Sequence, residues 1–214
     1  MQLTIESLVP IPLRDKLANN RSAIWQKNIV FQQGEIIFIK APSGTGKTTL
    51  IHILYGLRSD KQGHFRWGNK TDDIIDNNEW SKLRANDIGI VFQDLRLFPE
   101  LTAWENLEIK RLLTNTVTQQ QVLDWMGQLG VAHKREALAK TLSYGEQQRI
   151  AIIRALLQPF KWLLMDEPFS HLDKANIQKA ASLINEVSRL NKAGIILADL
   201  ESNSYFNYTQ ILEL

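Results

Sequence analysis

Short apolar runs alternate along this chain with longer stretches in which apolar residues recur at helical spacing. The runs have the length and the flanking turn residues of β-strands. They predict strands at residues 1–9, 24–31, 35–40, 64–67, 88–92, 161–166, 195–198 and 210–214. The longer stretches predict helices at residues 46–57, 102–130 with a break near 115–118, 146–157 and 173–190. Residues 10–22 hold two prolines and several polar side chains, and we expect them to form a loop.

The order of these elements predicts the architecture. Strands that alternate with helices favour a mostly parallel central sheet covered by helices on both faces. An antiparallel β subdomain is expected at one edge, and the more helical stretch at about 95–150 is expected to form a lobe of its own. We therefore predict that residues 1–214 form a single α/β domain.

Composition narrows the class of protein. The chain has 214 residues, 44% of them hydrophobic, which is enough for a sizeable core. A formal net charge of +2 is too small to indicate a nucleic-acid partner, and none is expected. The absence of cysteine excludes disulfides and thiolate metal sites, and it is compatible with a reducing cytoplasm. The four histidines are scattered, without the spacing of metal ligands.

The chain also lacks the sequence signals of membrane insertion. No apolar run reaches the roughly 18 residues that a membrane-spanning helix needs. The N-terminus alternates like a strand and has neither the basic start nor the apolar stretch of a signal peptide. If the protein works at a membrane, a partner must bring it there.

A glycine-rich loop, Ala41-Pro42-Ser43-Gly44-Thr45-Gly46-Lys47-Thr48, connects the strand at 35–40 with the next helix. Its glycines let backbone N–H groups converge on a phosphate, and the helix adds its positive N-terminal end. Lys47 can reach the β- and γ-phosphates, and the Thr48 hydroxyl can bind Mg²⁺. The alternative is a plain glycine turn beside a solvated lysine. The predicted nucleotide-binding residues are Ser43, Gly44, Thr45, Gly46, Lys47, Thr48 and Thr49.

Two further segments carry candidate chemistry. In Leu142-Ser143-Tyr144-Gly145-Glu146-Gln147-Gln148-Arg149, Ser143 offers a hydroxyl, Gly145 a bare backbone and the following helix its positive end. The structural alternative is that Ser143 caps this helix and Glu146 completes a capping box. In Trp162-Leu163-Leu164-Met165-Asp166-Glu167, an apolar strand delivers two acids to a loop. Elsewhere such a pair is often a solvated turn.

Together, these segments resemble the motifs of the nucleotide-binding domain of ATP-binding cassette (ABC) proteins, and the resemblance covers essentially the whole chain. Residues 142–149 are similar to the family's signature segment, and residues 162–167 to its second phosphate-binding strand. The resemblance implies the fold of a P-loop NTPase. It also implies that two copies meet head to tail, and that each ATP is held by the phosphate loop of one copy and by Ser143 and Gly145 of the other.

The resemblance further implies roles in ATP hydrolysis. Asp166 would hold Mg²⁺ through water, and Thr48 and Gln93 would be the other metal-binding residues. Glu167 would act as general base toward the attacking water. Lys47 and Gln93 would complete the catalytic group, Gln93 being similar to the glutamine of the family's switch loop. ATP and Mg²⁺ are the cofactors that this resemblance implies.

Three positions depart from the family's pattern. Ala41 replaces the usual first glycine of the phosphate loop, which costs little if its φ stays negative. Tyr144 replaces the first glycine of the signature segment. Asp199 stands where the family usually has a histidine that contacts the γ-phosphate. Because two unit charges about 4 Å apart repel by roughly 4 kcal/mol at an effective dielectric constant of about 20, we predict slow hydrolysis.

The base of the nucleotide has no obvious contact. The family tends to stack adenine on an aromatic side chain after the first strand, but residues 9–13 contain none. Trp25 is the nearest aromatic residue, and it is expected to belong to the core instead. Weak base selectivity, with GTP tolerated, is therefore our hypothesis.

Residues 94–107 resemble the same stretch in the subgroup of the family that serves lipoprotein release, macrolide export and cell-division complexes. In the wider family this region receives a short helix of the membrane subunit. Leu97, Phe98 and Leu101 are candidates for that apolar contact. The alternative is that these side chains simply fill the helical lobe.

The sequence thus favours the ATP-binding and ATP-hydrolysing subunit of an ABC transporter. It would be cytoplasmic, form a homodimer on ATP, and drive an integral membrane permease at the inner face of the cell membrane. Asp199, Tyr144 and Ala41 motivate an alternative, a regulatory or binding module that barely hydrolyses ATP. A soluble ABC protein of DNA repair or translation would generally need a coiled-coil insert or tandem cassettes. A simple P-loop kinase would leave residues 142–149 unexplained.

Overall fold

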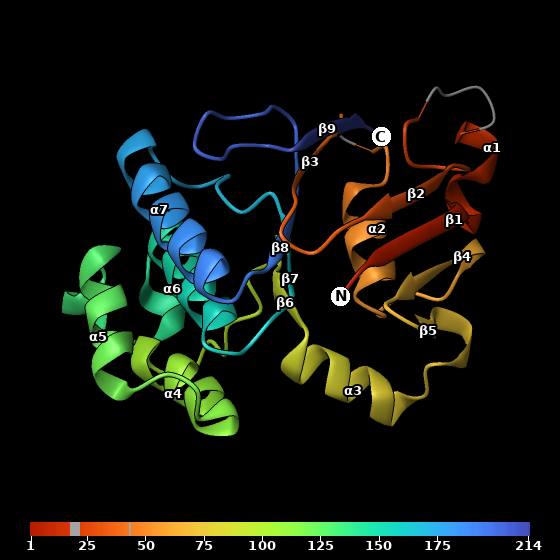
Figure 1. The fold of residues 1–214 in the computed structure, drawn as a ribbon. Helices are drawn as coiled ribbons and strands as arrows, with labels where there is room; N and C mark the ends of the chain where they lie inside the picture. Colours follow the sequence, from red (N-terminus) through yellow and green to blue (C-terminus); the bar gives the residue numbers. More distant parts are fainter. Residues whose placement is uncertain (18–21, 43) are drawn as a thin grey trace.

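The computed structural model describes residues 1–17, 22–42 and 44–214, and its centre is a sheet of five parallel strands (Figure 1). Their order across the sheet is β6-β7-β8-β3-β9. β3 lies between β8 and β9, with Lys40 at its end opposite Asp199. The strands are β3 (Ile36–Lys40), β6 (Ile88–Val91), β7 (Trp162–Asp166), β8 (Gly194–Asp199) and β9 (Gln210–Glu213).

A second sheet is antiparallel and forms the predicted edge subdomain, with the strand order β2-β1-β4-β5. Gly63, in β4, has a φ of +72°, and a Cβ there would lie 2.3 Å from the Ser7 carbonyl oxygen, so the close approach of β1 and β4 needs a glycine. The four strands are β1 (Leu3–Pro10), β2 (Asn28–Phe31), β4 (Lys61–Trp67) and β5 (Lys70–Thr71).

Alternation along the parallel strands divides the core into two layers. Leu163 and Met165 of β7 face one hydrophobic cluster, while Trp162 and Leu164 face the other. The first cluster includes residues of the four helices on one side of the sheet, and the second includes residues of α2 and the antiparallel sheet (Figure 1). The helices are α2 (Lys47–Leu54), α4 (Ala103–Thr114), α5 (Gln119–Gln128), α6 (Tyr144–Leu156) and α7 (Lys174–Leu190).

The helical lobe shows the predicted break between two helices. α4 ends at Asn115, which has a φ of +50°, and α5 begins after Thr118. Capping boxes fix both starts: Thr102 pairs reciprocally with Glu105, and Thr118 with Gln121. Two short 3-10 helices, η3 (Ala132–Lys134) and η4 (Ala139–Thr141), then lead into α6.

The structure contains some helices and strands that the sequence pattern did not predict. α3 (Asn77–Asn86) was missed because it is mostly polar and buries only Trp80 and Leu83. Of the expected loop at 10–22, residues 18–21 lie outside the described residues, and the part before them instead forms η1 (Ile11–Leu13) and α1 (Arg14–Leu17). Pro12 lies in the first turn of η1, so the prolines start a helix. The remaining differences are small: β2 begins at Asn28 rather than at residue 24, β4 begins three residues early, and β5 and η2 (Asp72–Ile74) follow it.

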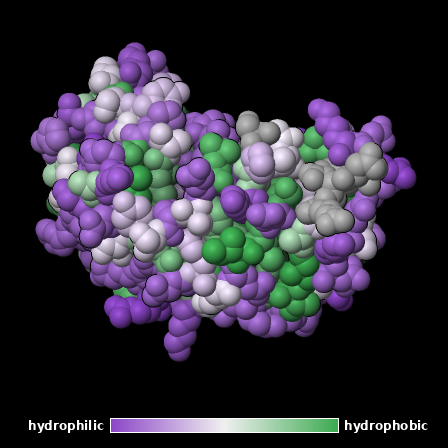
Figure 2. Space-filling model, turned by 90° about the horizontal axis from the view of Figure 1, so that it is seen from above, coloured by the Kyte–Doolittle hydropathy of each residue, from purple (hydrophilic) through white to green (hydrophobic). Residues whose placement is uncertain are grey.

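The surface is mostly polar. Seen from above, hydrophobic atoms gather toward the middle of the molecule, between two largely hydrophilic ends (Figure 2). Large apolar side chains that are exposed include Phe98 in the helical lobe and Tyr144 at the start of α6. Within the described ranges, every helix is too short or too polar to cross a lipid bilayer.

Candidate nucleotide site

The glycine-rich loop joins β3 to α2, as the sequence predicts. Gly44 and Gly46 have φ values of +80° and +104°, which side-chain-bearing residues rarely adopt. A Cβ on Gly46 would also lie 2.8 Å from Leu13 and 3.2 Å from Trp25. Ala41 is buried and is not among the residues with positive φ, so it meets the condition under which alanine is tolerated there. Ser43 lies outside the described residues.

Lys47, the first residue of α2, is the cation of this site. Its side chain is buried, and its ammonium donates to the Ala41 carbonyl at 2.8 Å. The same nitrogen lies 3.1 Å from Oε1 of Glu167. The carbonyl holds the lysine in place, and the carboxylate supplies its counter-charge.

A chain of hydrogen bonds joins three more of the predicted site residues. The Thr48 hydroxyl donates to Oε1 of Gln93 at 3.2 Å, and Nε2 of Gln93 donates to Oε2 of Glu167 at 3.1 Å. Glu167 therefore contacts both Lys47 and Gln93. These groups line a cavity of about 310 Å³, whose other lining residues are Leu13, Gly44, Gly46 and Thr49.

Asp166, at the end of β7, is buried beside this cavity. Neither of its carboxylate oxygens has a hydrogen-bond partner among the described residues. Burial raises the pKa of this carboxyl; Glu167 and Asp199 act in the same direction, whereas Thr48 and Lys47 oppose it. A buried acid without a donor, next to a threonine hydroxyl, is the oxygen-rich environment that Mg²⁺ prefers.

Glu167 has a strained backbone. Its φ is +44°, and its N–H donates to the Ala198 carbonyl at 2.9 Å. Non-glycine residues in this region cost about 1–3 kcal/mol and occur most often where function needs a defined orientation. This conformation turns the chain sharply after β7, so that Asp166 and Glu167 both reach the end of the sheet.

Asp199 ends β8 close to the same acids. Burial raises the pKa of its carboxyl, and Glu167 raises it further, while the Leu200 N–H and Lys47 lower it. Its Oδ1 accepts the Leu200 N–H at 2.7 Å. Asp166, Glu167 and Asp199 thus lie near Lys47, which is the only cation among the described residues that line the pocket.

Trp25 belongs to the core, as expected. It is buried among the residues of the antiparallel sheet and α2. Its indole N–H points at the Thr45 carbonyl, 3.4 Å away, so the ring supports the phosphate loop from below. Thr45 is fixed a second time by its own hydroxyl, which donates to the Pro42 carbonyl at 2.8 Å.

Ser143 and Gly145 lie apart from this cavity. Ser143 caps α6 and forms the predicted capping box: its hydroxyl accepts the Glu146 N–H, and its own N–H donates to Glu146 at 2.8 Å. Gly145 packs so tightly that a Cβ there would lie 2.8 Å from the His171 carbonyl oxygen. The Ser143 side chain is exposed, so the backbone and hydroxyl at the start of α6 remain accessible.

Two residues that the sequence reasoning missed hold α6 in place. Gln148 is buried; its amide donates to the Glu167 carbonyl at 3.3 Å and accepts the His171 N–H at 3.0 Å. Arg154 donates to the carbonyls of Leu95 and Arg96, both at 2.6 Å. Burial lowers the pKa of Arg154 to about 10. No sequence signal identifies these contacts, because both lie between segments distant along the chain.

Of the candidate residues for contact with a membrane subunit, some are exposed and others fill the helical lobe. Leu97 packs against the core of the helical lobe, whereas Phe98 is 54% exposed. Leu101 is half-buried and accepts the Ala139 N–H through its carbonyl at 2.8 Å. Phe98 lines a groove of about 310 Å³, together with Tyr55, Ile90, Phe92, Arg96, Asn106, Ile109, Lys110, Leu113, Arg154, Ala155 and Gln158.

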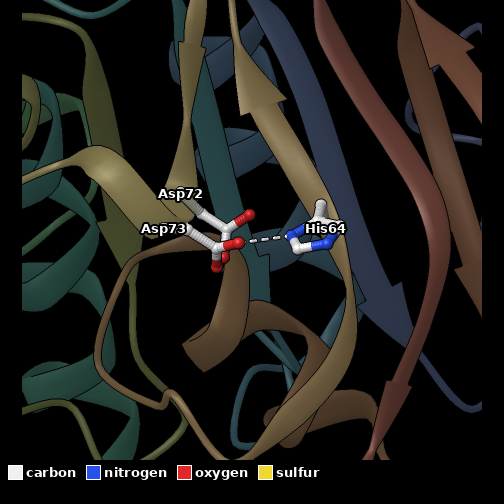
Figure 3. A group of neighbouring side chains, drawn as sticks. All are labelled: His64, Asp72 and Asp73. Carbon is white, nitrogen blue, oxygen red and sulfur yellow. Dashed lines mark ion pairs between the residues drawn. The ribbon is translucent and has the colours of Figure 1, made fainter.

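One group of charged residues lies far from the cavity. His64 of β4 pairs with Asp73 of η2, and Asp72 lies beside them (Figure 3). The sequence spacing gave no sign of this grouping. The Lys61 ammonium pairs with both carboxylates, and Asp72 also accepts the Phe65 N–H at 2.8 Å. Lys61 thus supplies the positive charge, and the group fastens η2 to β4.

The comparisons with known proteins identify the family of this chain. A family model described as ABC transporter matches residues 26–170. That span is more than half of the chain, and the chain belongs to this family. The predicted family and the fold class of a P-loop NTPase are confirmed. It is an ABC ATPase, a protein that binds and hydrolyses ATP.

Individual relatives give the same result. The lipoprotein-releasing system ATP-binding protein LolD of Pseudoalteromonas translucida (strain TAC 125) is 34% identical over 189 residues, covering 86% of this chain and 82% of LolD. The macrolide export ATP-binding/permease protein MacB of Marinobacter nauticus is 32% identical over 167 residues, but the match covers only 26% of MacB. The dimeric structure of MJ0796, a bacterial ABC transporter cassette, matches with a TM-score of 0.78 and 25% identity, over 93% of this chain and 88% of that chain.

Proposed function

We propose that this chain is the ATP-hydrolysing subunit of an ABC transporter, with Lys47, Gln93 and Glu167 as its catalytic group. The observation that carries this proposal is that Glu167 contacts both of the others at the edge of one cavity. Lys47 binds the β- and γ-phosphates. In the structure its ammonium pairs with the Glu167 carboxylate, which supplies the negative charge that the phosphates would supply. Glu167, once released from Lys47, accepts a proton from the attacking water.

Thr48, Gln93 and Asp166 are the residues that would hold Mg²⁺. The buried, unpartnered carboxylate of Asp166 supports this assignment, since it has the donor type that the ion selects. When bound, the ion supplies positive charge next to the phosphates. The main-chain N–H groups and side chains of residues 43–49 bind the phosphates themselves, at the positive end of α2.

A second copy of this chain completes the site with Ser143 and Gly145. Both residues lie at the exposed start of α6, outside the cavity that holds Lys47. A nucleotide bound at Lys47 of one copy would meet the positive helix end of the other. The likeness to a cassette solved as a dimer supports this arrangement.

The permease binds at the groove beside Phe98, and so carries the chain to the inner face of the cell membrane. The half-exposed ring of Phe98 and the apolar lining at Ile109 and Leu113 support this assignment. LolD is named for lipoprotein release and MacB for macrolide export, and MacB is named as both ATP-binding protein and permease. We infer that this chain drives a separate membrane protein, with residues 1–214 acting as one ATP-binding domain.

The experiment is a Glu167→Gln substitution. We expect ATP hydrolysis to fall by about 10²–10³-fold while ATP binding persists, because the proton acceptor is lost but the phosphate contacts remain. With Mg-ATP the variant should elute as a dimer in size-exclusion chromatography, and without nucleotide as a monomer. A variant that stays monomeric at saturating Mg-ATP would contradict the shared site.

Asp199 favours a second candidate, an ATP-controlled module with very slow turnover. Burial and Glu167 both raise the pKa of the Asp199 carboxyl, because a negative charge is disfavoured at this position. The terminal phosphate of a bound nucleotide would add a further negative charge beside Asp199 and Glu167. A steady-state ATPase assay separates the two candidates, since in a binding module Glu167→Gln would leave the already low rate unchanged. Comparing ATP with GTP in the same assay tests the weak base selectivity.

A further inference from the structure

His171 and Tyr144 form an exposed ring pair beside the start of α6. Their centroids are 4.6 Å apart, with 33° between the ring planes. Tyr144 is 60% exposed, which is unusual for an aromatic side chain in contact with another ring. The two residues come from the signature segment and from the loop after Glu167, so this contact connects two functional segments.

The main chain and one ring nitrogen of His171 are held firmly. Its N–H donates to buried Gln148 at 3.0 Å, and its carbonyl lies against Gly145. Nδ1 lies 3.0 Å from the Ser170 hydroxyl. Nε2 has no hydrogen bond within the part of the chain that the structure describes. The imidazole therefore presents one free nitrogen at the surface where Ser143 is exposed.

The phosphate cavity is rich in acidic side chains, so an additional hydrogen-bond donor such as the His171 imidazole would be useful there. Among the described residues, Lys47 is the only cation that lines this cavity, and Asp166, Glu167 and Asp199 lie near it. A bound triphosphate adds more negative charge, and Asp199 offers no proton donor when ionised. Additional donors would stabilise the charge that develops on the phosphates during hydrolysis. In the proposed homodimer, the partner copy can supply such donors in addition to those of the cavity.

We propose that His171 donates a hydrogen bond from Nε2 to the terminal phosphate of the nucleotide bound by the partner copy, with Tyr144 holding its ring. This proposal rests on the proposed homodimer, since His171 shares the exposed face of Ser143. His171 is then a catalytic residue acting across the interface, and Tyr144 is a positioning residue. The donor compensates for the acid at Asp199.

The first test is kinetic. We expect His171→Ala to lower kcat by about tenfold or more while KM for ATP changes by less than about threefold, because the contact forms chiefly in the transition state. In the Asp199→His background the same change should cost less than about threefold, because a donor is already present in the cavity. A kcat of His171→Ala close to that of the unaltered protein, or an equal loss in both backgrounds, would overturn the proposal.

The second test asks whether His171 acts across the interface. Neither Glu167→Gln nor His171→Ala alone should hydrolyse ATP well. In a mixed dimer, one site combines an intact Glu167 with the partner's intact His171. Mixing the two variants in equal amounts should therefore restore activity, up to a quarter of that of the unaltered dimer, because half of the dimers are mixed and each of these has one complete site. If the mixture is no more active than the separate variants, His171 does not act across the interface and the proposal fails.

Controls separate this failure from others. Lys174→Ala removes an exposed cation three residues further along and should leave kcat unchanged. Tyr144→Phe keeps the ring and should preserve kcat, whereas Tyr144→Gly should reproduce part of the loss seen in His171→Ala. Thermal unfolding verifies that each variant is folded. ATP-dependent dimerisation of Glu167→Gln is measured separately: without it the homodimer itself fails, and with it a negative mixing result counts against His171 alone.

Discussion

Two regions of this molecule are proposed to bind the nucleotide: the phosphate loop with the acids after β7, and the start of α6. They differ in which contacts their side chains make within one chain. The phosphate loop and the acids after β7 contact one another within one chain: Lys47 already has a counter-charge, and Thr48, Gln93 and Glu167 are linked by hydrogen bonds. At the start of α6, the Ser143 N–H and hydroxyl both donate to Glu146 of the same chain, although the Ser143 side chain is exposed. In the proposed dimer, the first region binds the nucleotide within one chain, and the second contributes only to the nucleotide of the other copy. Substitutions in the two regions should therefore fail in different ways.

The largest expected effect is that of Lys47→Ala. Loss of the cation that pairs with Glu167 should lower ATPase activity by about 10³-fold. It should also weaken nucleotide binding to the monomer, measured by calorimetry at low protein concentration. Ser143→Ala is the matched change in the other region: it should leave monomer binding unchanged and weaken only the ATP-dependent dimer. If Lys47→Ala and Ser143→Ala weakened nucleotide binding to the monomer equally, the two regions would not differ in the way described.

A smaller effect is expected from Gly46→Ala, for which Gly44→Ala is the control. Both positions have positive φ, so both substitutions strain the backbone by about 1–2 kcal/mol. Only at Gly46 would the added Cβ also press on Leu13 and Trp25, since nothing lies within 4 Å of it at Gly44. Denaturant unfolding should show the larger loss for Gly46→Ala. Equal losses would mean that the ring beneath the loop yields freely.

Asp166→Asn should stabilise the protein while impairing its function. Removing the unpartnered buried charge should raise the free energy of unfolding by about 1–3 kcal/mol at neutral pH without Mg²⁺. Because the folded-state pKa of Asp166 is raised, its protonated form is favoured in the fold at low pH, and that stability is lost as pH rises through the folded pKa. The gain should therefore shrink on acidification. Asp124→Asn, at an exposed position, should show no gain, and a gain independent of pH would contradict this account.

The smallest expected effect is a gain of activity in Asp199→His. Replacing an acid near Glu167 by a donor should raise the ATPase rate by about threefold or more, because repulsion of the terminal phosphate is removed. The gain should be confined to kcat, with nucleotide binding to the monomer little changed. An unchanged or lower rate would show that Asp199 is not what limits hydrolysis.

Much of the fold could be predicted from the sequence, because β3, β6, β7 and β8 are short, mostly apolar runs and the helices α4 to α7 each begin after a capping residue. The phosphate loop could also be predicted, since its glycines and Lys47 are local in sequence. The helix α3 could not, because only Trp80 and Leu83 give it an apolar face. The placement of Gln148 and His171 could not either. Their role depends on a contact between two segments that no local pattern encodes.

The helix α6 has a mechanical consequence. Gln148, near its beginning, holds the main chain of Glu167, while Arg154, near its end, clasps the turn that follows Gln93. A displacement of α6 would therefore move both the main chain of Glu167 and the turn at Leu95 and Arg96, which borders the Phe98 groove. In one copy the Glu167 carboxylate pairs with Lys47, and under the proposed function this pair must separate before Glu167 can accept a proton.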